Sequence, residues 1–419
     1  MQNMVIVGAG ECGTRAAFAL REQGFDGTIT LIGAEPYHPY ARPPLSKQFL
    51  LERDEQGNEV VPYIAQTDNF ADSDIRFLAG HRVSAIDTGL HQITVSSPTH
   101  ENHVMNYDKL LLATGTLPRP LPVPGVAGHP RCLYLRTLAD ARTIHHQLQQ
   151  AKQLLIVGGG LIGLELAASA RKLGVVVTVL EVAPQVLGRA VPTVFAEMLA
   201  ARHEQEGVVL RCGVQLSSVG HPDDRDGVTV TLHDGEMLHA DLIVIGIGAI
   251  PDQALAEQAE LTLDNGIVVD EYLQTSAENI LAAGDCCCFP CELLNGQLLR
   301  LETWRNAQSQ GNLAAANMLG KQEKITDIPW FWSDQYDLGL QVAGLSDPNH
   351  QTIQRPLKNG ALIQFELNDE GRLVAAGGLG EGNSVAKDIR LAEMLIAKGI
   401  HPDPEQLADP AVNLKKLLR

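Results

Sequence analysis

The sequence lacks long apolar runs, has little positive charge and has few cysteines. No apolar run reaches the roughly 18 residues that indicate a membrane span, and "LLIVGGGLIGL" ends at Glu165. No basic segment or cleavage site precedes the first strand-like run, "MVIVGAG", so we expect no signal peptide and no membrane attachment. With 32 Lys and Arg against 50 Asp and Glu, the formal net charge is -18. This charge disfavours nucleic acid as a partner, because phosphate binding requires clustered Lys and Arg.

The cysteines give a second set of exclusions. Seven cysteines in 419 residues is an odd number, which favours a reducing cytoplasm over a disulfide framework. Four of them lie in "CCCFPC", from Cys286 to Cys291, and Cys288 and Cys291 form a CxxC pair. A second CxxC and a nearby His at ligand spacing are missing, so we expect no metal site. We interpret these four residues as small buried side chains rather than as a thiol redox centre.

Length and composition set the class of protein. A chain of 419 residues is too long for one compact core and should form two or three domains. Apolar residues make up 45% and charged residues 20%, which is ordinary for a globular protein.

The first motif is an apolar strand followed by a glycine fingerprint, in "MVIVGAGECGTRAAFAL". Gly8 allows a tight turn, Gly10 a close approach to a pyrophosphate, and Gly13 close packing of helix on strand. The following helix directs free N–H groups and a positive dipole end at the phosphates. Glu35 follows the next strand, "TITLI", and is the candidate ribose-binding acid, although it lies two residues past the strand end.

The same motif is repeated in "QLLIVGGGLIGLELAASARKLGVVVTVLE". Gly158, Gly160 and Gly163 again stand between a strand and a helix, and Glu181 ends the second strand. One GxGxxG is weak evidence, because glycine-rich turns occur for packing reasons in many folds. Two copies, each followed by an acid, predict that the chain binds two dinucleotides.

Two later segments resemble the return strands of the FAD domain in flavoproteins that bind two dinucleotides. They are "KLLLATGTLPRP", with Ala113, Thr114 and Gly115, and "ILAAGDC", with Gly284 and Asp285. The resemblance implies that the first fingerprint binds FAD and the second NAD. It also implies that Asp285 hydrogen-bonds the ribityl chain and that Gly284 lets the backbone approach it.

The loop "YHPYARPPLSKQFL" resembles that of the NADH-dependent ferredoxin reductases of bacterial oxygenase systems, a group that includes rubredoxin and putidaredoxin reductases. Matching segments such as "GGGLIGLE" and "IPWFWSDQYDLGLQVAGL" cover nearly the whole chain. The resemblance implies that Arg42 contacts the phosphate and ribose region of FAD and that Lys47 lies near the flavin. It places Glu165 near flavin N5, where it pairs with Lys47; an interdomain salt bridge is the alternative. Pro and Ser occupy the position of the cysteine found in disulfide reductases.

The resemblance implies an α/β fold with two Rossmann-like domains and a smaller α+β C-terminal domain. The FAD domain would comprise residues 1–115 and 246–322, the inserted NAD domain residues 116–245, and the C-terminal domain residues 323–419. It adds Arg119 and Trp304 to the FAD site and Gly246 and Gly248 to the NAD site.

Trp304 and the segment "PWFWSDQY" have two interpretations each. Thr303 is a possible N-cap of a helix, and the resemblance directs that helix at the flavin, with Trp304 close to the ring; a core tryptophan is the alternative. The segment from Trp330 to Gln335 would lie on the docking face of an iron-sulfur partner, with Arg300 and Arg305 as basic contacts, or would be core packing.

The resemblance implies a reductase that passes hydride from NADH to FAD and then single electrons to a 2Fe-2S ferredoxin or rubredoxin. That partner would feed a ring-hydroxylating dioxygenase or a cytochrome P450. Two other functions use the same cofactors: reduction of a small acceptor such as monodehydroascorbate or a quinone, and redox sensing of the apoptosis-inducing-factor type. A thiol reductase is disfavoured because the cysteine pair is missing.

Overall fold

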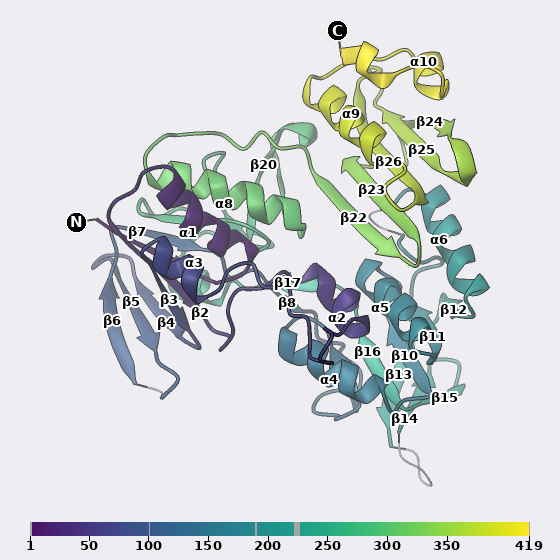
Figure 1. Ribbon diagram of the computed structural model, residues 1–419, viewed down its shortest axis with the longest axis horizontal. Coiled ribbons are helices and arrows are strands. Elements are labelled where there is room, and N and C mark those ends of the chain that lie inside the picture. Colours follow the sequence, from purple (N-terminus) through teal and green to yellow (C-terminus); the bar gives the residue numbers. More distant parts are fainter. Residues whose placement is uncertain (1, 100, 189–190, 222–226, 419) are drawn as a thin grey trace. The chain divides into compact units, whose positions relative to one another are not determined.

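The computed structural model describes residues 2–99, 101–188, 191–221 and 227–418. The residues group into two compact units (Figure 1). The first unit comprises residues 1–41, 61–117 and 250–329, and the second comprises residues 42–60, 118–249 and 330–419. The expected division into FAD, NAD and C-terminal domains stays a prediction.

The first unit is built on a five-stranded parallel sheet in the order β19-β7-β1-β2-β3. Strands β1, β2, β7 and β19 are largely buried and rich in Val, Ile and Leu, as is typical of a parallel sheet covered on both faces, whereas the edge strand β3 is mostly half-buried. Helices α1 (Glu11–Glu22) and α8 (Trp304–Met318) pack against each other beside this sheet (Figure 1). The strands are β1 (Asn3–Val7), β2 (Thr28–Gly33), β3 (Ile75–Ala79), β7 (Lys109–Leu112) and β19 (Ile280–Ala282).

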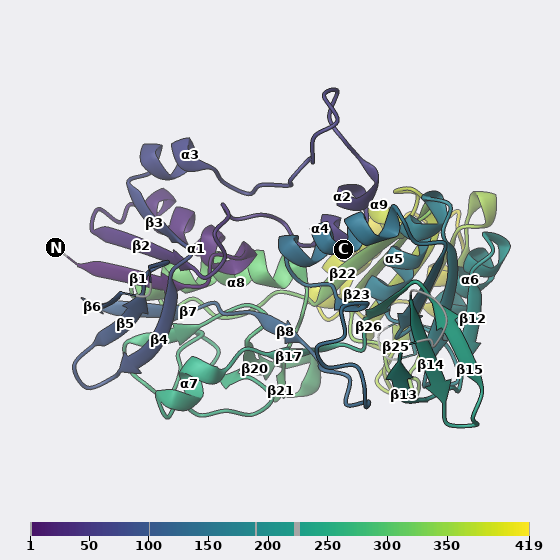
Figure 2. The same ribbon diagram turned by 90° about the horizontal axis from the view of Figure 1, so that it is seen from below.

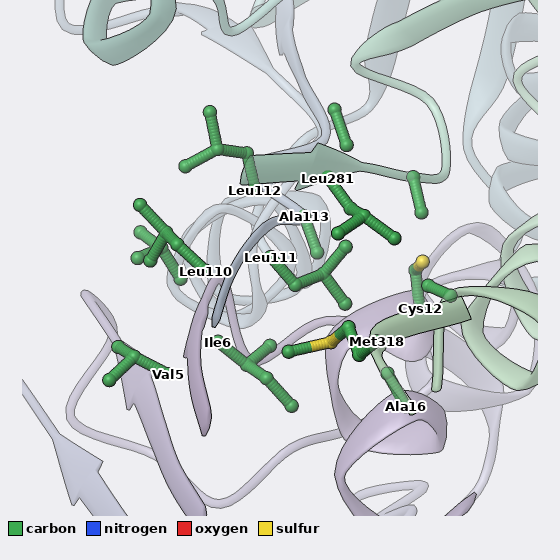
Figure 3. Packing of buried hydrophobic residues seen from close by; sticks show 14 of the residues in the cluster. Val5, Ile6, Cys12, Ala16, Leu110, Leu111, Leu112, Ala113, Leu281 and Met318 are labelled. Carbon is green, nitrogen blue, oxygen red and sulfur yellow. The ribbon is translucent and has the colours of Figure 1, made fainter. Parts of the chain in front are cut away.

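Small side chains allow this close packing. A Cβ on Gly311 of α8 would lie 2.6 Å from the carbonyl oxygen of Cys12 in α1, so only glycine fits there. Figure 3 shows Cys12 and Ala16 of α1 gathered with Met318 of α8 beside Leu111 and Leu281 of the sheet. The core of the first unit therefore lies between the sheet and this helix pair.

Smaller elements complete the first unit. Strands β4 (Arg82–Asp87), β5 (Gln92–Ser96) and β6 (Asn102–Asn106) form a separate antiparallel sheet (Figure 2). A second small sheet contains β18 (Ile267–Val268), β20 (Cys287–Cys291) and β21 (Gln297–Leu299). The remaining elements are α3 (Thr67–Asp72), α7 (Ala254–Gln258) and η2 (Glu292–Leu294). The chain passes between the units near β8 (Thr116–Pro118) and β17 (Ala249–Pro251).

The second unit repeats the parallel design, with the order β12-β11-β10-β16-β9. The strands are β9 (Cys132–Tyr134), β10 (Gln153–Val157), β11 (Val176–Glu181), β12 (Val209–Cys212) and β16 (Leu242–Ile245). An antiparallel sheet of β13 (Leu216–Gly220), β14 (Val228–Leu232) and β15 (Met237–Ala240) accompanies it. The helical elements of this part are η1 (Pro43–Ser46), α2 (Gln48–Leu51), α4 (Leu138–Leu148), α5 (Leu161–Lys172) and α6 (Thr193–Gln205).

The C-terminal part of the second unit is an antiparallel sheet in the order β22-β23-β26-β25-β24. Helix α9 (Ala386–Ala397) packs on β23 and β26 (Figure 1). The strands are β22 (Trp330–Gln335), β23 (Leu338–Gly344), β24 (Gln351–Pro356), β25 (Leu362–Leu367) and β26 (Leu373–Glu381). Short helices η3 (Lys358–Gly360), α10 (Pro404–Ala408) and η4 (Leu414–Leu418) complete it.

Two parallel sheets with helices and one antiparallel sheet with helices confirm the fold class expected from the sequence. Across the described residues, every helix is too short or too polar to cross a membrane.

Candidate functional site

The first fingerprint is a turn that only glycine can form. Gly8 has a φ of 110°, and a Cβ there would lie 2.1 Å from the carbonyl oxygen of Ala113. A Cβ on Gly13 would lie 1.9 Å from the carbonyl oxygen of Gly8. Gly10 differs, since a Cβ there would meet nothing within 4 Å. Gly8 and Gly13 thus serve the turn and the packing, while Gly10 leaves open space at the N-terminus of α1.

The second fingerprint repeats this geometry. Gly158 has a φ of 109°, and its Cβ would lie 2.4 Å from the carbonyl oxygen of Gly246; a Cβ on Gly163 would lie 2.2 Å from that of Gly158. Gly160, like Gly10, faces open space. Helices α1 and α5 therefore begin at a glycine without a side chain, where an anionic phosphate can approach the backbone N–H groups. This fits one dinucleotide at each fingerprint.

The two candidate ribose acids are held differently. Glu181 ends β11, and its carboxylate accepts backbone N–H groups of Gly159 (2.7 Å) and Ala183 (2.8 Å). The side chain is therefore fixed beside the second fingerprint. Glu35 lies two residues beyond β2 and accepts the hydroxyl of Tyr40 at 2.6 Å. The ribose contacts of both acids stay predictions.

The return segments meet the first fingerprint. Ala113 follows β7 and faces Gly8, and a Cβ on Gly284 would lie 3.0 Å from the Cβ of Cys12 in α1. The Thr114 hydroxyl donates to the carbonyl of Asp252 at 2.6 Å. The structure thus brings the first-unit members of the expected FAD site to one end of the parallel sheet: Gly8, Gly10, Gly13, Ala113, Thr114, Gly115, Gly284 and Asp285.

Helix α8 begins as the sequence predicted. Thr303 is its N-cap, and the Thr303 hydroxyl accepts the backbone N–H of Asn306 at 3.2 Å. Trp304 is the first residue of the helix and is partly buried. Its proposed contact with the flavin stays a prediction.

Glu11 is a residue that the sequence reasoning missed. It lies inside the first fingerprint, and its carboxylate accepts the side-chain amide of Gln308 at 2.9 Å. Burial raises its pKa, and Oε2 is buried without a hydrogen-bond partner. The available signal was an acid between Gly10 and Gly13, at the start of the helix that the fingerprint assigns to phosphate binding.

Glu165 of α5 is the centre of a buried polar cluster in the second unit. Lys47 Nζ lies 3.2 Å from Glu165 Oε1, and the two residues expose only 9% and 6% of their surface. The hydroxyl of Ser46 donates to Oε2 at 2.6 Å, and that of Ser333 donates to Oε1 at 2.7 Å. The expected ion pair is present; its place beside the flavin stays a prediction. Ser46 and Ser333 were not predicted, because isolated serines carry no signal of distant contacts.

Trp332 and Asp334 of β22 complete the surroundings of Lys47. Lys47 Nζ lies 5.6 Å from the centre of the Trp332 ring and 3.7 Å from Asp334 Oδ2. Trp330 and Trp332 stack with centroids 5.4 Å apart. Trp330 and Trp332 are half-buried, so the aromatic segment is neither fully buried in the core nor fully exposed on the surface.

Two further residues of the predicted cofactor sites, Arg42 and Arg119, lie in the second unit, whereas the predicted docking residues Arg300 and Arg305 lie in the first. Arg42 donates from Nη1 to the carbonyl of Arg136 at 2.6 Å. The backbone N–H of Arg119 donates to the carbonyl of Gly248 at 3.0 Å. A residue predicted to bind FAD and a residue predicted to bind NAD are therefore joined by a backbone hydrogen bond. Their cofactor contacts stay predictions.

The cysteines are placed where reactivity is low. Cys286, Cys287, Cys288 and Cys291 are all buried, as is Cys12. Burial raises the pKa of each of these thiols. Because the thiolate is the reactive form, this placement agrees with a packing role.

Two glycine-turn nucleotide sites, one in each unit, define a pyridine nucleotide-dependent oxidoreductase. The family model described as pyridine nucleotide-disulphide oxidoreductase matches residues 2–311, and the model described as reductase C-terminal matches residues 330–418. The chain belongs to the pyridine nucleotide-disulphide oxidoreductase family, which confirms the resemblance inferred from the motifs. The expected enzyme class and the expected cofactors, FAD and NADH, are likewise supported.

Individual relatives extend this result over the full chain. The chain is 40% identical to the anthranilate 1,2-dioxygenase system ferredoxin–NAD(+) reductase component of Burkholderia cepacia, covering 99% of this chain and 98% of that protein. It is 38% identical to rhodocoxin reductase of Rhodococcus erythropolis, covering 99% and 93%. Among solved structures, the covalent putidaredoxin reductase–putidaredoxin complex matches with a TM-score of 0.90 and 36% identity, covering 100% of this chain and 98% of that chain.

Proposed function

We propose that the chain is an NADH-dependent ferredoxin reductase that passes electrons through FAD to a 2Fe-2S ferredoxin or rubredoxin of an oxygenase system. The observation that carries this proposal is similarity along the whole chain to reductase components of such systems, including one solved with its redoxin partner. The terminal oxygenase would be a ring-hydroxylating dioxygenase or a cytochrome P450.

The chain supplies binding, orientation and charge. Bound FAD provides the chemistry that joins a two-electron hydride donor to a one-electron acceptor. The bare backbones at Gly10 and Gly160 admit the two pyrophosphates. The fixed carboxylate of Glu181 accepts hydrogen bonds from the ribose hydroxyls of NADH and repels a 2′-phosphate.

The charged groups control the site around the flavin. Lys47 and Glu165 hold a paired charge in a buried setting, where electrostatic interactions are stronger than in water. If the flavin lies beside α8, the positive dipole end at the helix N-terminus, capped by Thr303, would favour negative charge on it.

The thiol chemistry of disulfide reductases is not part of the proposal. The four cysteines from Cys286 to Cys291 are buried with raised pKa values. Ser46, the last residue of η1, donates its hydroxyl to the Glu165 carboxylate instead. We also propose that the protein works in the reducing cytoplasm, since all seven cysteines are free.

A comparison of electron acceptors tests the proposal. The purified flavoprotein is mixed with NADH and either a 2Fe-2S ferredoxin, monodehydroascorbate or a quinone. We expect kcat/KM for ferredoxin to exceed that for both small acceptors. A higher value for a small acceptor would favour the alternative reductase, and slow turnover with every acceptor together with a long-lived reduced complex would favour a redox sensor.

A further inference from the structure

A chain of hydrogen-bonded polar side chains within the second unit connects the buried Glu165 to the half-buried Tyr336. Gln335 Nε2 lies 3.1 Å from the Ser333 hydroxyl, which contacts Glu165. His203 Nε2 lies 2.8 Å from Gln335 Oε1. The Tyr336 hydroxyl lies 3.2 Å from His203 Nδ1. Ser333 and Gln335 expose 1% and His203 0%, so these groups must satisfy one another rather than water.

Glu165 forms an ion pair with Lys47 and is therefore treated as a carboxylate. The direction of each hydrogen bond follows from this charge. A carboxylate only accepts, so the Ser333 hydroxyl donates to it and can only accept from Gln335. The Gln335 amide therefore turns its NH2 group toward Ser333 and its oxygen toward His203. His203 must then donate from Nε2, which leaves Nδ1 to accept from Tyr336. All four hydrogen bonds point toward Glu165.

His203 and Tyr336, the two residues farthest from Glu165 in this chain of hydrogen bonds, are both favoured in their neutral forms. Burial lowers the pKa of His203, which faces Gln335, Tyr336, Arg202 and Glu206. Burial also raises the pKa of Tyr336 to about 12, so its hydroxyl keeps its proton. A neutral imidazole with one donor and one acceptor nitrogen is the form that this chain of hydrogen bonds requires.

We propose that His203 and Gln335 are positioning residues that lock the Glu165 carboxylate in place against Lys47. The inference rests on the proposed function, which gives Glu165 and Lys47 their role beside the flavin. Aligned donors in a low-dielectric interior reinforce one another. Ser333 and Ser46 hold different oxygens of Glu165, so a fixed Ser333 also fixes the carboxylate plane.

The matched pair His203→Leu and His203→Gln tests the proposal kinetically. Leucine removes the donor, whereas a glutamine amide nitrogen can occupy the place of Nε2 and donate to Gln335. In stopped-flow experiments we expect His203→Leu to reduce its flavin about tenfold more slowly at saturating NADH, with the Kd for NADH changed less than about twofold. His203→Gln should recover to within about threefold of the wild type. Gln335→Met, similar in volume, should reproduce the leucine result if His203→Leu fails to fold.

Nitrogen NMR of the oxidised, histidine-labelled holoenzyme gives a readout that does not depend on turnover. We expect His203, identified by the signal missing in His203→Gln, to be the neutral Nε2–H tautomer at pH 7. An Nδ1–H tautomer, an imidazolium, or equal rates for the leucine and glutamine variants would overturn the proposal. Ferredoxin enters neither measurement, so failure of the proposed ferredoxin activity would be seen separately.

Discussion

Lys47 Nζ lies 3.2 Å from Glu165 Oε1 inside the second unit, although the residues are 118 positions apart in the chain. Both side chains are nearly buried, and two serine hydroxyls bind the same carboxylate. Removing one partner of a buried ion pair leaves an uncompensated charge, which is more harmful than removing both. We therefore expect a change in either residue to alter the stability of the protein and, if the pair lies beside the flavin as proposed, the rate of hydride transfer.

Lys47→Met should destabilise the protein by about 3 kcal/mol in urea unfolding, because it leaves Glu165 unpaired. The double variant Lys47→Met with Glu165→Leu should recover part of this loss, since no buried charge remains. Both variants should retain FAD but transfer hydride more slowly in stopped-flow experiments. Wild-type stability and wild-type rates in Lys47→Met would show that the pair has neither role.

The protein should use NADH about 100-fold more efficiently than NADPH, and Glu181 should account for much of this preference. Glu181→Ala should reduce the ratio of kcat/KM values about tenfold or more, because the fixed carboxylate no longer repels a 2′-phosphate. Glu35→Ala is the matched control, because Glu35 is the corresponding acid of the first fingerprint. The ratio of kcat/KM values for NADH and NADPH should not change in this variant. Equal efficiency of the wild type with both nucleotides would contradict the assignment.

The buried thiols should react slowly with Ellman's reagent at pH 8. Burial raises the pKa of Cys132 to about 11 and also raises that of Cys286 and Cys287, so their thiolate fraction at pH 8 is below that of a free cysteine. The reaction rate of the native protein should therefore keep rising with pH beyond the range in which a free thiol levels off. The half-buried Cys212 should react fastest, ahead of the six buried thiols.

Replacing the clustered cysteines tests the same interpretation through activity. Cys288→Ser with Cys291→Ser removes the CxxC pair and should leave flavin reduction and electron transfer largely intact, with a stability loss of about 1 to 3 kcal/mol. Lost turnover with FAD retained would indicate a functional thiol pair.

The sequence predicts the nucleotide turns well because their determinants are local. Gly8 and Gly158 need positive φ, and Gly13 and Gly163 need a missing Cβ, so the residue type at fixed spacing encodes the geometry. The N-cap at Thr303 is local in the same sense.

The cluster around Glu165 could not be predicted in this way. Ser46 and Ser333 reach Glu165 from 119 and 168 positions away, and serine is common on any strand or loop. The link from His203 to Gln335 spans 132 positions. Such contacts depend on how β22 packs beside α5 and α6, which hydrophobic periodicity does not specify.

Arg305→Ala should raise the KM for ferredoxin several-fold and leave NADH-to-ferricyanide turnover nearly unchanged, because an acidic chain needs local basic contacts to bind an acidic partner. Arg300→Ala is the matched control: its side chain is only 10% exposed, so we expect it to contact a docked partner less and to have a smaller effect. Trp332→Phe should also raise the ferredoxin KM. Equal loss of both activities would place docking elsewhere.

The central claim is that ferredoxin is the physiological acceptor, and the most direct test is NADH-dependent reduction of cytochrome c with and without an added 2Fe-2S ferredoxin. We expect reduction to depend on ferredoxin, and to weaken as added salt screens the local attraction between the two proteins. Fast cytochrome c reduction by the reductase and NADH alone, unchanged by ferredoxin, would contradict the account.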